Sequence, residues 1–183
     1  LESGGDPQAM PDLTYSQFKA FHETYYHPSN AYIYFYGDDP EAERLNIIES
    51  WLKDFEKKET HSQIPLQPKF PAPQKLTYPY DSGDTSNPKA YLSINWLLPE
   101  VEDIQTSLEF SLLSHILLST PASPLKKILI ESGLGENITG GFDEHLRQPM
   151  FSAGLKGVQP ENLGKVEALI MDSLQKLSRE GID

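Results

Sequence analysis

The sequence has 183 residues, enough for one sizeable hydrophobic core or two small lobes, and its 38% hydrophobic content is that of a globular protein rather than a disordered chain. It contains no cysteine, which excludes disulfides, thiolate metal sites and a cysteine nucleophile. The net charge of −12 disfavours nucleic acid and anionic membrane as partners, because binding phosphates requires clustered Lys and Arg.

The first predicted elements are a helix, a strand and a second helix. Thr14 and Gln17 have the spacing of a capping box, so a helix begins after Thr14, and Pro28 ends it. Aromatic and β-branched residues at 31–38 predict a strand. Asp39 can cap the next helix, which carries an apolar stripe. The stripe consists of Leu45, Ile48, Leu52 and Phe55.

Residues 59–73 differ from their surroundings, because four prolines interrupt a polar stretch that has no hydrophobic period. This composition predicts an extended linker on the surface. Two further strands are expected at 74–80 and 89–98, separated by a turn-rich stretch at 81–88.

The C-terminal half predicts helices around a strand pair. A largely buried helix is expected over 103–119, and a short helix over 124–132 that Gly133 ends. The strands are expected at 137–143 and 150–158, followed by a long amphipathic helix from Pro160 to about Arg179. The buried side of the first helix is predicted to carry Leu108, Leu112, His115 and Ile116.

Paired strands between helices indicate an α+β fold, a two-layer sandwich of a mostly antiparallel sheet with helices packed on one face. We expect residues 1–30 to form a leading segment and helix that continue from an upstream domain, and residues 31–183 to form a single domain. Because the chain begins with Leu1 and reads like mid-chain sequence, we expect it to be part of a larger protein. No signal peptide or membrane-spanning apolar run is recognised, so the compartment stays open, with a soluble protein of the bacterial cytoplasm or an organelle interior both compatible.

The histidines predict no metal site. His22 and His27 are five residues apart and cannot share one helical face, while His115 is expected to be a core histidine. The stretch from Gly141 to His145 ends in Glu-His like the zinc motif H-x-x-E-H, but glycine stands where the first histidine ligand belongs.

Ser123, with Lys126 and Lys127, could be read as a serine nucleophile beside two bases. Serine before Pro124 is, however, a helix N-cap signature, and both lysines fall on the first turn away from the core. We therefore predict no catalytic residue in this chain. The candidate contact residues for a peptide or another domain are Ser119, Thr120, Pro121, Ala122, Lys126 and Lys127.

Three blocks of the sequence together resemble zinc peptidases of the pitrilysin/insulysin clan, peptidase family M16, in the presequence protease-like branch. They are LTYSQFKAFHETYYHPSNAYIYFYGD (13–38), LLSTPASPLKKILIESGLG (117–135) and FSAGLKGVQPENLGKVEALIMDSLQKL (151–177). These blocks are similar to the family's second, non-catalytic repeat. The first repeat carries H-x-x-E-H and binds zinc, and two halves of the protein close over an acidic chamber that degrades unfolded peptides.

The resemblance implies that residues 31–183 form an inactive-type domain, a chamber wall that lacks H-x-x-E-H and is inactive alone. Zinc would belong to the catalytic domain upstream in the same polypeptide, with no cofactor in this chain, and the peptide substrate would be the second partner. An acidic wall would favour basic, presequence-like peptides. Two alternatives stay open: a non-enzymatic interaction or assembly module in a protein that lacks a functional catalytic repeat, and a serine hydrolase centred on Ser123.

Overall fold

The chain divides between Pro65 and Leu66 into two units, each compact on its own. The computed structural model describes residues 5–80, 87–100 and 103–182. The division expected after residue 30 stays a prediction. The proline-rich segment 59–73 contains no helix or strand and crosses the boundary between the units.

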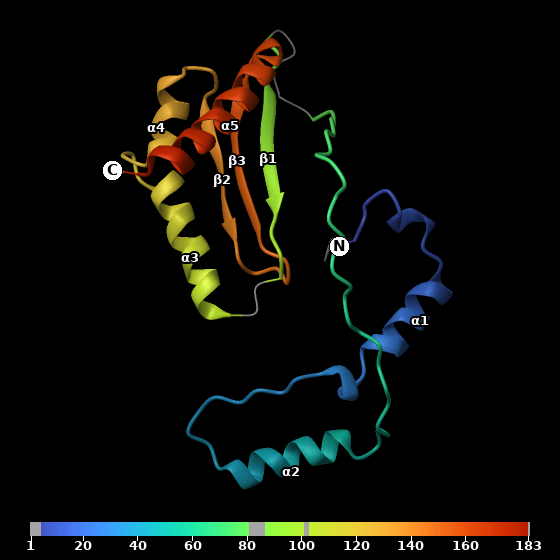
Figure 1. The fold of residues 1–183 in the computed structure, drawn as a ribbon. Coiled ribbons are helices and arrows are strands. Elements are labelled where there is room, and N and C mark those ends of the chain that lie inside the picture. Colours follow the sequence, from blue (N-terminus) through green and yellow to red (C-terminus); the bar gives the residue numbers. More distant parts are fainter. Residues whose placement is uncertain (1–4, 81–86, 101–102, 183) are drawn as a thin grey trace. The chain divides into compact units, whose positions relative to one another are not determined.

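The first unit contains helices α1 (Tyr15–Tyr25) and α2 (Glu41–Leu52) (Figure 1). The predicted capping box is confirmed, because the Thr14 hydroxyl accepts from the Gln17 amide at 3.3 Å and the Gln17 side chain accepts from the Thr14 amide at 2.9 Å. No residue of either helix is buried, so the apolar stripe predicted on α2 does not reach a core within this unit.

Two predictions in the first unit are wrong. Residues 31–38 form no strand, because a strand requires a neighbour for its backbone groups and none pairs with them among the described residues. Asp39 does not cap α2, whose N-cap is Pro40. The Asp39 carboxylate instead binds the guanidinium of Arg44 at 2.8 and 2.9 Å. That guanidinium lies 5.1 Å from the ring centre of Phe35.

The second unit contains an antiparallel sheet of β1 (Ala90–Leu97), β2 (Asn137–Asp143) and β3 (Met150–Val158), in the order β1-β3-β2. Helices α3 (Ile104–Ser114), α4 (Pro124–Glu131) and α5 (Leu163–Glu180) lie to one side of it (Figure 1). The prediction of an α+β fold with an antiparallel sheet is therefore confirmed, as are the strand pair and the long last helix.

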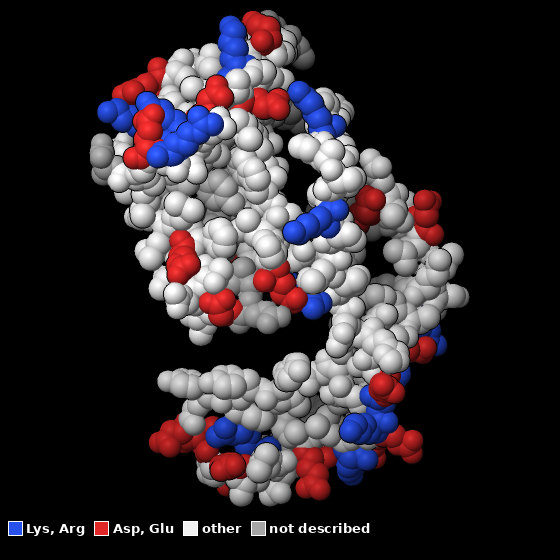
Figure 2. All heavy atoms as spheres, in the orientation of Figure 1, with Lys and Arg blue, Asp and Glu red and all other residues white. Residues whose placement is uncertain are grey.

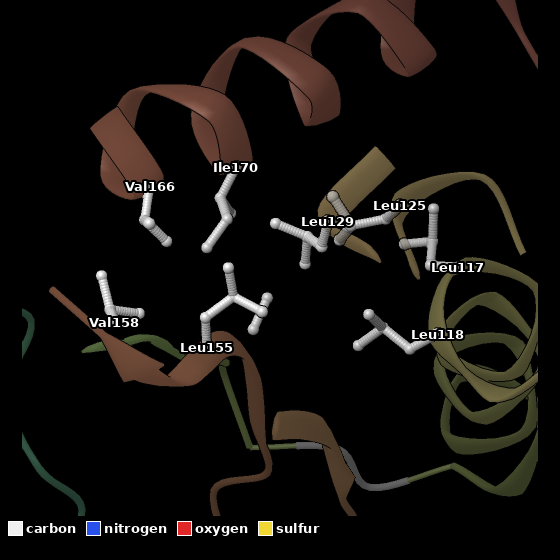
Figure 3. Close-up of a cluster of buried hydrophobic side chains, with 9 residues drawn as sticks. Leu117, Leu118, Leu125, Leu129, Leu155, Val158, Val166 and Ile170 are labelled. Atoms are coloured by element: carbon white, nitrogen blue, oxygen red, sulfur yellow. The ribbon is translucent and has the colours of Figure 1, made fainter. Parts of the chain in front are cut away.

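The core lies between β3 and the helices. Figure 3 shows Val166 and Ile170 of α5 pointing toward Val158 and Leu155 of β3. Ala153 of β3 and four leucines from α4 and the π-helical turn before it complete the cluster: Leu117, Leu118, Leu125 and Leu129. On β1, alternate residues Leu92, Ile94 and Trp96 pack against this core, while the residues between them are exposed.

The sequence places the helix at 103–119 correctly but predicts the wrong buried face. Its last turn, His115–Ser119, is a π-helical turn, which holds more residues per turn than an α-helix and rotates the following side chains. Ser114, Leu117 and Leu118 are the buried residues of this stretch. The four residues expected inside are exposed, and His115 is not a core histidine: Leu108, Leu112, His115 and Ile116.

The strand predicted at 74–80 is also absent. Pro79 removes a backbone donor from this segment, and no neighbouring strand pairs with it among the described residues. Leu76 and Tyr78 are exposed, and the Tyr80 hydroxyl donates to the carbonyl of Lys89 at 3.0 Å. Of the turn-rich stretch predicted at 81–88, residues 81–86 lie outside the described part of the chain.

Candidate functional site

The loop before α4 holds most of the contact residues proposed from the sequence. Ser123 occupies the N-cap position of α4, but its hydroxyl makes no capping bond, which corrects the role expected for it. Ser123 is 3% exposed, and its hydroxyl accepts from the Thr120 amide at 3.0 Å and lies 3.3 Å from the carbonyl of His115. Ser123 therefore fastens the loop to the π-helical turn.

Both lysines near Ser123 are engaged as cations. The Lys126 ammonium donates to the carbonyl of Ser119 at 3.2 Å, and that of Lys127 lies 3.9 Å from the carboxylate of Glu131. A serine nucleophile requires a base that accepts its proton, but the Ser123 hydroxyl makes its hydrogen bonds with Thr120 and the carbonyl of His115. Neither lysine is among these hydrogen-bond partners, and a role of this loop in recognition stays a prediction.

Pro121, Ala122 and Lys127 line an open depression on the outer side of α4 with a volume of about 420 Å³. Ile130 and Glu131 complete its lining. Ser119 and Thr120 are exposed and do not line this depression. The six residues thus lie along one loop and the first turn of α4 without converging on a common centre.

A second hollow, of about 340 Å³, lies between α4 and β2. We call it the α4–β2 groove. Its lining is formed by Leu118, Lys126, Leu129, Ile130, Gly135, Glu136, Asn137, Ile138, Gly140 and Leu155. Strand β2 pairs with β3 on one side only, and no described residue pairs with its other side. The groove therefore borders an open strand edge, whose backbone groups can pair with an added strand.

The backbone conformation of this edge requires glycine at position 140. Its φ of +121° is a conformation that other residues rarely adopt, and a Cβ atom there would collide with the carbonyl oxygen of Ser152 on β3. Reasoning from the sequence alone did not select Gly140 or the groove. The signal that points to it is the pair Gly140-Gly141 inside a predicted strand, since glycine in a strand often marks a bulge or a close backbone approach.

The charges around the groove are balanced. Lys126 and Glu136 are its charged lining residues, and the Glu136 carboxylate lies 3.4 Å from the ammonium of Lys89. Figure 2 shows acidic and basic side chains intermixed over the part of the second unit where α4 lies. The acidity of the chain as a whole is thus not concentrated at this groove.

The remnant of the zinc motif does not fit a metal ion. Gly141 offers no ligand atom, the Glu144 carboxylate accepts from the Ser107 hydroxyl at 3.3 Å, and the His145 amide donates to the carboxylate of Asp143 at 3.1 Å. No three His, Asp or Glu side chains in the described ranges come close enough to share an ion. Over the same ranges, no helix has the length and hydropathy that crossing a membrane requires.

The second unit is thus a two-layer α+β domain with an open strand edge beside a groove. Residues 12–183 match the family model described as "Peptidase M16 inactive domain". The chain therefore belongs to the peptidase M16 family, and the resemblance drawn from its sequence is confirmed.

The chain is 49% identical over 189 residues to presequence protease 1, chloroplastic/mitochondrial, of Arabidopsis thaliana, with 100% of this chain and 18% of that protein covered. It is 36% identical over 187 residues to the mitochondrial presequence protease of Mus musculus, covering 99% of this chain and 18% of that protein. It thus spans about a fifth of the length of these relatives. A solved protease from Helicobacter pylori shares the fold, with a TM-score of 0.66, 18% identity, and 98% of this chain and 43% of that chain covered.

Proposed function

We propose that this chain is the non-catalytic domain of a zinc metalloendopeptidase, where it forms part of the wall of a chamber that degrades unfolded peptides. The match to an inactive domain and the identity to presequence proteases support this proposal. Zinc and the catalytic residues would belong to another domain of the same polypeptide, and this chain would be inactive alone.

The open edge of β2 is the observation that carries the proposal. An unfolded peptide is extended, and an extended peptide can add to an unpaired strand edge through its backbone, whatever its sequence. Such a contact suits a protein that must hold many different unfolded substrates. The loop from Ser119 to Ala122, with Lys126 and Lys127, would contact either the peptide or a neighbouring domain.

Targeting presequences are the substrate class that we propose. They are basic, and a chain of net charge −12 attracts basic peptides from a distance. The names of two similar relatives, presequence proteases of mitochondria and chloroplasts, point to the same class.

Backbone N-methylation of a peptide tests the edge contact. Alternate amides of a strand point to the same side, so two peptides methylated at odd or at even positions differ only in which side they block. In the full-length protein that contains this chain, with a chelator present to stop hydrolysis, we expect one of the two peptides to lose binding and the other to keep it. Equal binding of both would contradict the edge contact.

Activity and metal content test the remainder of the proposal. Residues 1–183 purified alone are expected to hold no stoichiometric zinc and to cleave no peptide, while the full-length protein cleaves presequence peptides. Cleavage by residues 1–183 alone would contradict the proposal. A full-length protein without peptidase activity would instead support the assembly-module alternative.

A further inference from the structure

We propose that the α4–β2 groove is a subsite for one large apolar side chain of a peptide that lies extended along the open edge of β2. This inference rests on the proposed function and adds a preference in peptide sequence to it. The edge contact alone would be indifferent to sequence, since it uses only the backbone.

The position of the groove determines which side chains of the peptide can reach it. Side chains of an added strand alternate between the two faces of the sheet, so every second side chain points toward the layer that contains α4. The groove lies on that side, between the strand edge and α4. Gly140 contributes only backbone to the groove lining, because it has no side chain.

The lining decides what kind of side chain fits. Five large apolar residues from α4, the π-helical turn and the two strands line the groove: Leu118, Leu129, Ile130, Ile138 and Leu155. Ile130 is 57% exposed at its rim, while Leu129 and Leu155 are buried behind it. A leucine or phenylalanine entering the groove would cover the exposed part of Ile130 and exclude water from it.

The charges of the groove disfavour a basic side chain. The Lys126 ammonium is held by the carbonyl of Ser119, and the Glu136 carboxylate has the ammonium of Lys89 at 3.4 Å. An arginine or lysine of the peptide would lose part of its hydration in the groove. It would find no unpaired carboxylate in the lining, because Glu136 already has Lys89 as its partner. The groove therefore selects apolar residues, and the attraction of basic peptides arises elsewhere on the protein.

A host–guest peptide series tests the subsite. One unstructured peptide with a single variable position, occupied in turn by Gly, Ala, Leu, Phe, Glu or Arg, is titrated against the full-length protein by fluorescence polarisation, with a chelator present. We expect Leu and Phe to bind roughly tenfold or more tightly than Gly, as burial of one large apolar side chain supplies. Arg and Glu are expected to bind no more tightly than Ala.

The substitution Ile130→Trp fills the groove from its exposed rim without touching the core. It is expected to remove the preference for Leu and Phe while Gly and Ala peptides bind as before. Met171→Trp is the matched control, because Met171 is exposed on α5, lies outside the groove lining and receives the same new side chain. Circular dichroism melting of both variants checks that the fold is retained, and Ile130→Ala, which shortens the rim, should weaken the same preference if Ile130→Trp is unstable.

The outcomes separate the two proposals. If every guest binds equally in the wild-type protein, or if Ile130→Trp leaves the preference intact, the subsite is wrong and the edge contact stands. A preference for Arg over Leu at the variable position would also overturn the subsite. If no peptide binds and both N-methylated peptides behave alike, the proposed function fails and the subsite with it.

Discussion

Gly157 lies directly against the side chain of Glu136, and a Cβ atom at residue 157 would come within 2.6 Å of the Glu136 carboxylate. Lys156 pairs with Tyr91 and Val158 with Ala90, so Gly157 is the extra residue of a β-bulge in β3. Its φ of +77° lies in the left-handed region. The Glu136 amide also donates to the carbonyl of Lys156 at 2.8 Å, which ties the beginning of β2 to the bulge.

Gly157→Ala is therefore expected to lower the free energy of unfolding by about 1–3 kcal/mol, because it adds backbone strain and displaces Glu136. Chemical denaturation of the wild type and the variant measures the difference. Gly164→Ala is the control, since a Cβ atom in that position of α5 meets nothing within 4 Å. It should be neutral or stabilising by up to about 1 kcal/mol. Equal losses in both variants would argue against the bulge.

Ser123→Ala tests the role of the buried hydroxyl. We expect it to lower the free energy of unfolding by about 1–3 kcal/mol, because the Thr120 amide loses its acceptor in a part-buried place. The thermal midpoint should fall, while peptide cleavage by the full-length protein below that midpoint stays unchanged. A cleavage rate reduced by several orders of magnitude in the folded variant would contradict the structural role and revive the serine nucleophile.

The neighbouring residues Ile170 and Met171 test the core. Ile170 is fully buried on the inner face of α5, and Met171 is 47% exposed on the same helix. Ile170→Ala should lower the free energy of unfolding by about 2–5 kcal/mol through the cavity that it leaves. Met171→Ala should change it by no more than about 0.5 kcal/mol. Comparable losses would mean that the exposed face of α5 is covered in solution.

Asp103 predicts a pH dependence at the beginning of α3. Its carboxylate accepts from the Thr106 amide at 2.7 Å, and this bond holds the pKa of Asp103 below its usual value. Because the folded state has the lower pKa, the stabilisation is present above the pKa of the unfolded chain and is lost as pH falls through the folded pKa. Asp103→Asn, which can still cap but does not titrate, should lack this acid-dependent loss. Thermal midpoints of both proteins between neutral pH and pH 2 measure it, and parallel curves would exclude the effect.

The sequence predicts best those structural features that are determined by residues close together in the chain. The capping box of Thr14 and Gln17 spans one helical turn, and both the pattern and the geometry are local. The pairing of β2 with β3 is likewise predicted from the sequence, because these two strands follow each other in the chain and form a hairpin.

The sequence predicts poorly what depends on distant partners. The stretch that contains Tyr32 has the composition of a strand, but composition does not supply the neighbour that a strand requires. The buried face of the helix before Ser119 was missed because apolar residues lie on more than one side of it, such as exposed Leu112 and buried Leu118, so the apolar pattern does not select one face. The groove was missed because its two sides, α4 and β2, come together only in the folded structure.

The lack of buried side chains in α1 and α2 has a consequence for how the first unit opens. These helices have 11 and 12 residues, and isolated helices shorter than about 12–15 residues are marginal in water. Without a core of their own, their amide protons should exchange with solvent through fraying of single helices, well before those of β3, which is central in the sheet. Hydrogen exchange should therefore divide the chain near Pro65, and a protease added to the folded protein should make its first cuts on the N-terminal side of that residue.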